Sequence, residues 1–156
     1  MTLAMRRDWT LVFILALAAR VVFALPQTRP GYMDACYNTV GGQQLAAGRG
    51  FTEPFLWNYL DHPAGLPGPN HQYWMPLPSI LAALAMSVGG VTFRAAQIPF
   101  LVLSALLAVI AYGVAWQTSA SRRHARAAAI LVVLFGFYMT YWRLGVRNRR
   151  SNCETD

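Results

Sequence analysis

Long apolar runs bounded by arginine are the feature that most constrains this chain. Charged residues make up only 12% of its 156 residues, about half the share of a typical globular protein. All 13 basic residues are arginine, and most gather at the ends of the apolar runs, as in Arg6–Arg7, Arg122–Arg126 and Arg147–Arg150. Flanking positive charge of this kind orients membrane helices. We therefore expect an all-α integral membrane protein.

The apolar runs predict about three transmembrane helices, at residues 9–25, 93–116 and 126–142. A cleaved signal peptide is the competing interpretation of the first run, which follows a basic start. The run 76–90 is short for a spanning helix, and we expect it to lie along the membrane surface. Arg20 interrupts the first run near its end, where a long side chain can snorkel to the interface.

Charge also decides the orientation. The positive-inside rule places the N-terminus and the basic loop around Arg122–Arg126 in the cytoplasm. The segment 26–75 is then extracytoplasmic, as is the polar tail 143–156. Because the arginines do not form one polar face interleaved with aromatic residues, we expect no nucleic-acid partner.

The segment 26–75 concentrates the polar chemistry of the chain. It holds six of the nine prolines, seven of the twelve glycines, three of the six acids and all histidines but His124. Loops of this length without a function are uncommon. Residues 35–47 predict a short helix that ends at Gly48, and we expect Gly41–Gly42 to serve as a loop hinge.

Asp34 is the first candidate for catalysis. It follows the first apolar run closely, so its carboxylate would lie just above the membrane. A carboxylate there can act as a general base on an acceptor hydroxyl or amine, close to a donor that a lipid presents. The alternative is that Asp34 caps the helix 35–47.

Asp61 and His62 form a second candidate site, with Glu53 and His71 nearby in the sequence. A carboxylate and an imidazole can bind a divalent cation or a phosphate group. Their spacing is not that of a known metal site, so we assign no metal ligand. The alternative is that they are turn residues of a Pro/Gly-rich loop.

Aromatic side chains are frequent in the same segment, and Tyr37 and Trp74 are the two that we select as substrate-binding candidates. Aromatic rings can stack on a sugar face or line a lipid groove. The alternative is an interfacial aromatic belt.

The order of these features resembles the start of the GT-C-type glycosyltransferases, of the protein-O-mannosyltransferase and aminoarabinose-transferase kind (glycosyltransferase family 39). After the first helix come Tyr32-Met33-Asp34-Ala35-Cys36-Tyr37 and then Gln44-Leu45-Ala46-Ala47-Gly48-Arg49-Gly50-Phe51, similar to the family's LA-x-G-x-G-aromatic stretch. Trp74-Met75-Pro76-Leu77-Pro78 resembles its PPL motif. Gly90–Pro99 and Ser121–His124 resemble the start of its next span and its basic cytoplasmic turn.

The resemblance covers about residues 6–142 and implies a function. In that family the first outer loop carries two membrane-parallel helices and a catalytic Asp, which Asp34 matches. The implied reaction transfers a sugar from a polyprenyl-phosphate-linked donor to an acceptor on the outer face of the bacterial plasma membrane. Asp61 and His62 would then help to position the donor phosphate or the acceptor. The sequence identifies no cofactor.

The sequence also departs from the family. It lacks the acidic pair found at Asp34-Ala35 in many members, has Met75 where some members have Lys or His, and shows fewer spans. A fragment, a frameshifted product and a short relative without activity remain open. The alternative function is a non-catalytic membrane subunit that binds a partner protein or lipid through the aromatic outer loop. A small transporter is a third, weaker interpretation. It predicts charged residues inside the spans, and only Arg20 meets that expectation.

Overall fold

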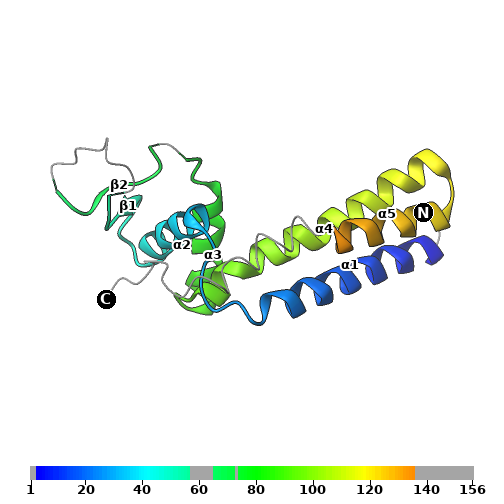
Figure 1. Cartoon of the computed structure of the whole chain (residues 1–156), viewed down its shortest axis with the longest axis horizontal. Coiled ribbons are helices and arrows are strands. Elements are labelled where there is room, and N and C mark those ends of the chain that lie inside the picture. The colour runs from blue at the N-terminus through cyan, green and yellow to red at the C-terminus, as the bar shows by residue number, and fades with distance from the viewer. Residues whose placement is uncertain (1–2, 57–64, 73, 136–156) are drawn as a thin grey trace. The chain divides into compact units, whose positions relative to one another are not determined.

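The computed structural model describes residues 3–56, 65–72 and 74–135. Over these residues the protein is mostly helical (Figure 1), which confirms the predicted helical class. The described elements are α1 (Leu3–Ala24), α2 (Met33–Ala46), β1 (Thr52–Glu53), β2 (Gly68–Pro69), α3 (Leu77–Gly89), α4 (Phe93–Ser119) and α5 (Arg122–Leu134).

The described residues divide into two compact units. The three-helix unit contains α1, α5 and the part of α4 that begins at residue 100. The α2–α3 unit contains the described part of 28–99, and therefore also the two strands and the first turns of α4. The division falls next to Pro99, inside α4, where proline cannot donate the helical hydrogen bond to the preceding turn.

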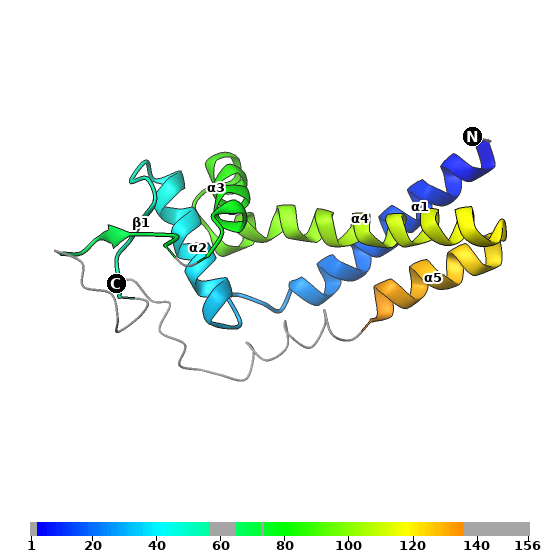
Figure 2. The same ribbon diagram turned by 90° about the horizontal axis from the view of Figure 1, so that it is seen from above.

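In the three-helix unit the helices run side by side, with α4 antiparallel to α1 and α5 (Figures 1 and 2). Small residues fill the contacts between them. Such residues let helix backbones approach closely, which is typical of helix contacts in membranes. The buried residues form two clusters, Ala16 with Ala105 and Ala108, and Tyr112 with Ala125 and Ala129.

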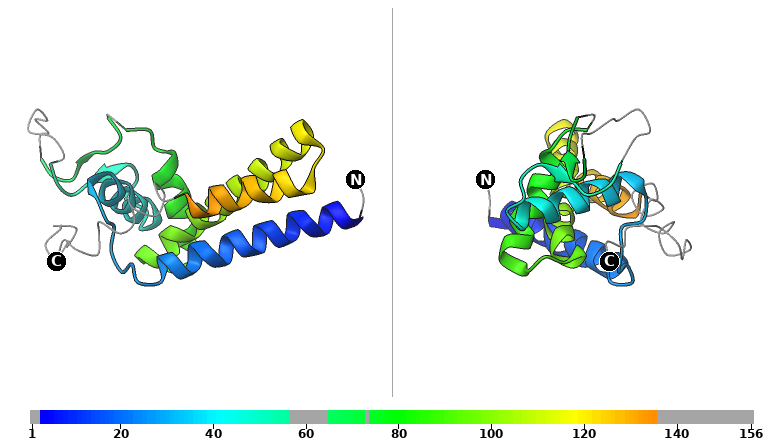
Figure 3. Two further views of the ribbon diagram at one scale, coloured as in Figure 1. Left: turned by 45° about the vertical axis from the view of Figure 1, so that its right-hand side comes forward. Right: turned by 90° about the vertical axis from the view of Figure 1, so that its left-hand side faces the viewer.

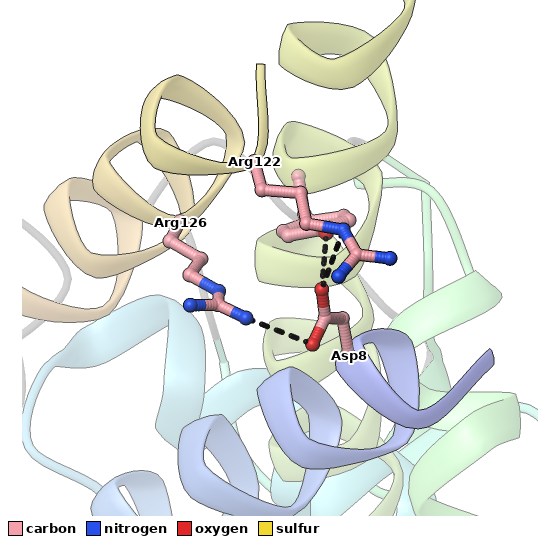
Figure 4. Close-up of polar contacts among 4 residues, drawn as sticks. Asp8, Arg122 and Arg126 are labelled. Carbon is pink, nitrogen blue, oxygen red and sulfur yellow. Dashed lines mark hydrogen bonds and ion pairs between the residues drawn. The ribbon is translucent and has the colours of Figure 1, made fainter. Parts of the chain in front are cut away.

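A buried carboxylate joins the three helices at one end of this unit (Figure 4). Asp8 of α1 is only 4% exposed. The Tyr112 hydroxyl of α4 donates a hydrogen bond to it over 3.0 Å, and the Arg126 guanidinium of α5 donates another over 3.1 Å. Arg122 adds an ion pair at 3.7 Å. Burial acts to raise the pKa of Asp8, but these hydrogen bonds and positive charges together hold that pKa below its ordinary value.

Arg20 makes a second connection, further along the same helices. It is 6% exposed, and its guanidinium donates a 3.0 Å hydrogen bond to the backbone carbonyl of Val132. This carbonyl lies in the last turn of α5, where backbone carbonyls lack helical partners. The expectation that Arg20 snorkels outward is therefore wrong, because its side chain turns inward to α5.

By length and composition, α4 is the one helix among the described residues that could cross a membrane. Only 28% of its most apolar stretch is buried inside the protein. The predicted first span, 9–25, falls in α1, whose 22 residues also include three arginines and Asp8. The predicted third span, 126–142, begins in α5, but residues 136–142 lie outside the described residues.

Helix α2 ends at a glycine, where the sequence predicts its end. Gly48 has a φ of 74°, which L-residues with a side chain adopt reluctantly. Its N–H donates to the Leu45 carbonyl and the Arg49 N–H donates to the Gln44 carbonyl. This pair of bonds is a Schellman motif, which satisfies two of the last carbonyls of the helix.

Helices α2 and α3 pack closely against each other in the α2–α3 unit (Figure 3). The buried residues of α3 are Ser79, Ala82 and Met86, which share one face. A Cβ atom added to Gly42 would lie 2.9 Å from the Ala82 Cβ and 3.2 Å from the Ser79 carbonyl. The expectation that Gly41–Gly42 forms a loop hinge is therefore wrong, because both glycines lie inside α2 at its contact with α3.

A short antiparallel pairing of β1 and β2 joins the two ends of the connection from α2 to α3. Thr52 pairs with Pro69, and Glu53 pairs with Gly68. The pairing brings the residues after β2 back to α2.

The face of α3 opposite its contact with α2 exposes large apolar side chains, among them Leu84 and Val88.

Replacing Asp8 tests the connection at the end of the three-helix unit. Asp8→Asn keeps the side-chain shape but removes the charge that Arg122 and Arg126 face, so we expect a lower midpoint of thermal unfolding. The matched control Arg123→Gln removes a charge that makes no ion pair among the described residues, and it should leave the midpoint near that of the wild type. The difference in unfolding midpoint between Asp8→Asn and the wild type should narrow as the pH falls below 3.8. There the Asp8 carboxylate, whose pKa in the folded state is lowered, begins to take up a proton. Equal midpoints near neutral pH would contradict the structural role of Asp8.

Replacing Gly42 tests the contact between α2 and α3. In Gly42→Val the new carbon atoms meet Ala82 and the α3 backbone, and overpacking of this kind typically costs about 1–3 kcal/mol. The control is Gly65→Val, because a Cβ atom at Gly65 meets nothing within 4 Å and such substitutions usually change stability by less than about 0.5 kcal/mol. Chemical denaturation measures both, and equal stabilities would contradict the close contact.

Candidate functional site

Asp34 lies in the first turn of α2, where the sequence places the predicted base. The residue that caps this helix is Tyr32, and its side chain makes no capping bond. The alternative that Asp34 is the helix cap is therefore wrong. Asp34 is half-buried, and its carboxylate has no hydrogen bond or ion pair within the described ranges. Its negative charge suits the positive end of the helix dipole.

One turn further along α2, Asn38 connects the Asp34 region to α3. The Asn38 amide donates a 2.8 Å hydrogen bond to the backbone carbonyl of Asp34. The buried hydroxyl of Ser79 donates a 3.0 Å hydrogen bond to the backbone carbonyl of Asn38 and lies 3.3 Å from its side-chain oxygen. These bonds fix the first turns of α2 against the start of α3, so the backbone that carries Asp34 has a defined position in this unit.

Tyr37 is not an exposed platform for a sugar ring. It is 2% exposed, and its hydroxyl accepts a 2.6 Å hydrogen bond from the backbone N–H of His71. Its ring meets those of Phe55 and His71 edge to face, with centroids 6.5 Å and 5.3 Å away. In this structure Tyr37 therefore packs inside the unit, where it attaches α2 to the segment that follows β2.

His71 is the most unusual residue of this region. It is a non-glycine residue with a φ of 64°, a conformation that costs energy and that is enriched at functional sites. Its backbone N–H also donates a 2.7 Å bond to its neighbour Asn70. Both ring nitrogens are buried, and neither makes a hydrogen bond among the described residues. Burial lowers the pKa of His71, and the nearby backbone of Trp74 offsets part of this shift.

Gly41 allows this close packing. A Cβ atom at Gly41 would lie 2.6 Å from the amide nitrogen of Asn70, 2.8 Å from the Ser79 hydroxyl and 3.2 Å from the His71 ring. Three polar side chains from two segments thus converge on the bare backbone of α2. Any larger residue at position 41 would push them away.

Of the other residues that the sequence predicts for the site, the structure describes Trp74 and Glu53. Trp74 lies at the surface, next to the strongly exposed Met75. Glu53 of β1 is buried. Asp61 and His62 lie outside the described residues. Within the described ranges no three side chains of the His, Cys, Asp or Glu type gather closely enough to hold a metal ion.

Sequence reasoning missed Asn38, Asn70 and Ser79, and it grouped His71 with Asp61 and not with Tyr37. No periodic signal identifies the contacts between distant segments, because the bond from His71 to Tyr37 spans 34 positions and the bond from Ser79 to Asn38 spans 41. The strongest available signal was the Gly41–Gly42 pair, since two glycines inside a predicted helix usually have a packing reason.

Comparison of the chain with known proteins finds no matching family model, no matching curated protein and no matching solved structure.

The buried ring of His71 predicts a pH-dependent stability of the α2–α3 unit. Because the pKa of His71 is lower in the folded state, the unfolded chain binds a proton first as the pH falls. Stability should therefore be complete above about pH 6.5 and should decline as the pH falls through the folded pKa. Thermal unfolding at about pH 7.5 and about pH 5.5 measures the decline.

The test variant for this prediction is His71→Asn, since Asn tolerates a positive φ. The variant should lose most of the pH dependence, whereas His124→Asn, at an exposed position of α5, should retain it. An unchanged pH dependence in His71→Asn would assign the effect to another group.

Proposed function

We propose that this chain is a membrane-embedded GT-C-type glycosyltransferase, or part of one, with Asp34 as its general base. The observation that carries the proposal is the half-buried carboxylate of Asp34, which has no partner among the described residues and sits at the start of a segment flanked by apolar helices. A general base needs a free lone pair and a backbone in a fixed position. The backbone of Asp34 is held by the hydrogen bond that it accepts from Asn38, which in turn accepts a bond from Ser79 of α3.

The distribution of side chains in the three-helix unit supports a membrane location. The fully buried residues between its helices are mainly alanines, against which a few larger side chains such as Phe13 and Leu17 pack, whereas many of the large apolar side chains face outward. Water would favour the opposite arrangement, but lipid tails solvate Leu and Ile while small residues let helices meet. The outward-facing residues include Leu11, Ile14, Leu15, Val22, Leu103, Leu106, Leu107, Ile110, Val114, Ile130 and Leu131.

We infer three spanning helices at the predicted spans 9–25, 93–116 and 126–142, of which residues 136–142 lie outside the described residues. The arginines at the start of α1 and α5 mark the cytoplasmic end by the positive-inside rule. Asp34 follows the other end of α1 and would therefore lie on the outer face. The exposed apolar face of α3 fits a helix that lies along the membrane surface.

The proposed reaction transfers the sugar in one displacement. The Asp34 carboxylate takes the proton of an acceptor hydroxyl or amine, and the acceptor atom bonds to the anomeric carbon. The bond from that carbon to the phosphate oxygen breaks, and its electron pair leaves with the polyprenyl phosphate. Asp61 and His62 remain proposed contacts of the donor phosphate or the acceptor. Trp74, at the surface, is the proposed sugar-stacking residue.

A non-catalytic membrane subunit is the second candidate function. Several large apolar side chains in and after the outer segment are exposed, with Met75 at 83%. Scattered exposed apolar residues are ordinary, but a cluster of them can mark an interaction site. The exposed group that favours a protein or lipid partner is Phe51, Leu56, Leu66, Trp74, Met75 and Leu77.

Replacing Asp34 tests the proposed reaction in the intact protein, reconstituted in nanodiscs. Polyprenyl-phosphate mannose and polyprenyl-phosphate aminoarabinose serve as donors in parallel, and release of polyprenyl phosphate is measured. General-base catalysis contributes about 10²–10⁴-fold, so Asp34→Asn should lower the rate by at least about 100-fold. Asp34→Glu should retain part of the activity.

The midpoint of thermal unfolding serves as the control for folding, and it should be similar in the three proteins. Transfer at the wild-type rate by Asp34→Asn would remove the base assignment. Absence of transfer by the wild type, together with co-purification of a larger membrane protein, would favour the non-catalytic subunit.

A further inference from the structure

Five arginines gather at the end of the three-helix unit that contains Asp8. Two lie in the first turns of α1 and three in the first turns of α5, and the bonds from Asp8 to Arg122 and Arg126 hold these two helix ends together (Figure 4). Asp8 is the one acidic residue among the described residues of this unit, so the local charge is strongly positive. The cluster, called the arginine end below, consists of Arg6, Arg7, Arg122, Arg123 and Arg126.

The arginine end is not fully neutralised within the protein. Asp8 compensates Arg122 and Arg126, whereas Arg6, Arg7 and Arg123 are exposed and make no ion pair with any described residue. Moreover, α5 has no acidic residue in its first turn, where the helix dipole favours negative charge. Asp8 already faces Arg122 and Arg126, so the charges that an external anion would neutralise are those of Arg123 on α5 and of Arg6 and Arg7 on α1.

Exposed apolar residues follow the arginines on the same two helices. On α1 they begin one turn after Arg7, and on α5 one turn after Arg126. The residues are Leu11, Ile14 and Leu15 of α1, and Ile130, Leu131 and Leu134 of α5. An anion that fits here should therefore carry an apolar part, since a free phosphate would leave this neighbouring surface uncovered.

We propose that the arginine end binds the phosphate groups of anionic phospholipids, with Arg6, Arg7 and Arg123 as the contacting side chains. The acyl chains of the same lipids cover the exposed apolar residues of α1 and α5. Guanidinium groups bind phosphate through paired, charge-assisted hydrogen bonds. Asp8 acts indirectly, because it keeps α1 and α5 close enough for one lipid layer to meet both. The proposal needs the membrane location of this unit but not the transfer reaction.

A lipid titration of the full chain in neutral detergent tests this proposal. Short-chain phosphatidylglycerol and phosphatidylcholine of equal chain length are compared, with inorganic phosphate as the free anion. We expect the wild type to bind phosphatidylglycerol more tightly than the other two probes. The preference should vanish at about 1 M salt, where the Debye length is about 3 Å.

One double variant that removes two charges locates the site. A basic residue near an anionic membrane surface is worth about a fivefold change in affinity, so Arg7→Gln combined with Arg123→Gln should weaken phosphatidylglycerol binding by about 25-fold. Neither residue contacts Asp8, so the fold should persist. The matched control Arg94→Gln removes an exposed charge from the α2–α3 unit and should change nothing.

Three results would overturn the proposal. The first is equal affinity of the wild type for the two lipids, and the second is equal affinity for inorganic phosphate and phosphatidylglycerol. The third is an unchanged lipid preference in the double variant. The wild-type comparison at low and high salt keeps the proposal testable even if the double variant does not fold. These measurements report lipid binding and not sugar transfer, so the lipid proposal and the transfer proposal can fail independently.

Discussion

The three-helix unit depends on the hydrogen bonds and ion pairs that the buried carboxylate of Asp8 makes with the other two helices. A buried charge is costly unless cations and hydrogen-bond donors surround it, and here α4 supplies a donor while α5 supplies the cations. Tyr112 comes from α4, and Arg122 and Arg126 come from α5. Because no single helix can satisfy this carboxylate, the three helix ends must meet at one place.

The contacts along the helices follow from that meeting point. From Asp8 onward, α1 approaches α4 through Ala16, and Arg20 then satisfies a carbonyl in the last turn of α5. Alanine contacts contribute little specificity of register, since one methyl group fits many positions. The two polar connections, Asp8 at one end and Arg20 further along, therefore fix which turns face each other, while the alanines allow the helices to come close.

Sequence patterns predicted the local features well and the tertiary ones poorly. The end of α2 at Gly48 follows from the preference of one residue for a positive φ, which is a local property. By contrast, Asp8 meets Tyr112 across 104 positions and Arg126 across 118, and nothing in the composition of either segment names its partner. The sequence pattern therefore assigns no role to Asp8, and it places Arg20 at the interface only because a long side chain near a helix end can snorkel.

The candidate site shows the same limit. The residue type of Tyr37 predicts a sugar-binding ring, but its hydroxyl accepts a bond from the His71 backbone and its ring packs against the ring of His71. The Gly41–Gly42 pair was assigned to a hinge because glycine is flexible, whereas its missing Cβ atoms are what α3 and Asn70 require. In both cases the residue type marks an important position, but the structural role of the residue depends on a neighbour that is distant in sequence.

The two carboxylates of Asp8 and Asp34 show why environment decides chemistry here. Asp8 is surrounded by a hydroxyl and two guanidinium groups that favour its charged form, so it cannot readily accept a proton and serves to hold helices together. Asp34 has a held backbone but a carboxylate without a partner among the described residues. Of these two acids, Asp34 alone has the lone pairs available that removal of a proton from an acceptor would require.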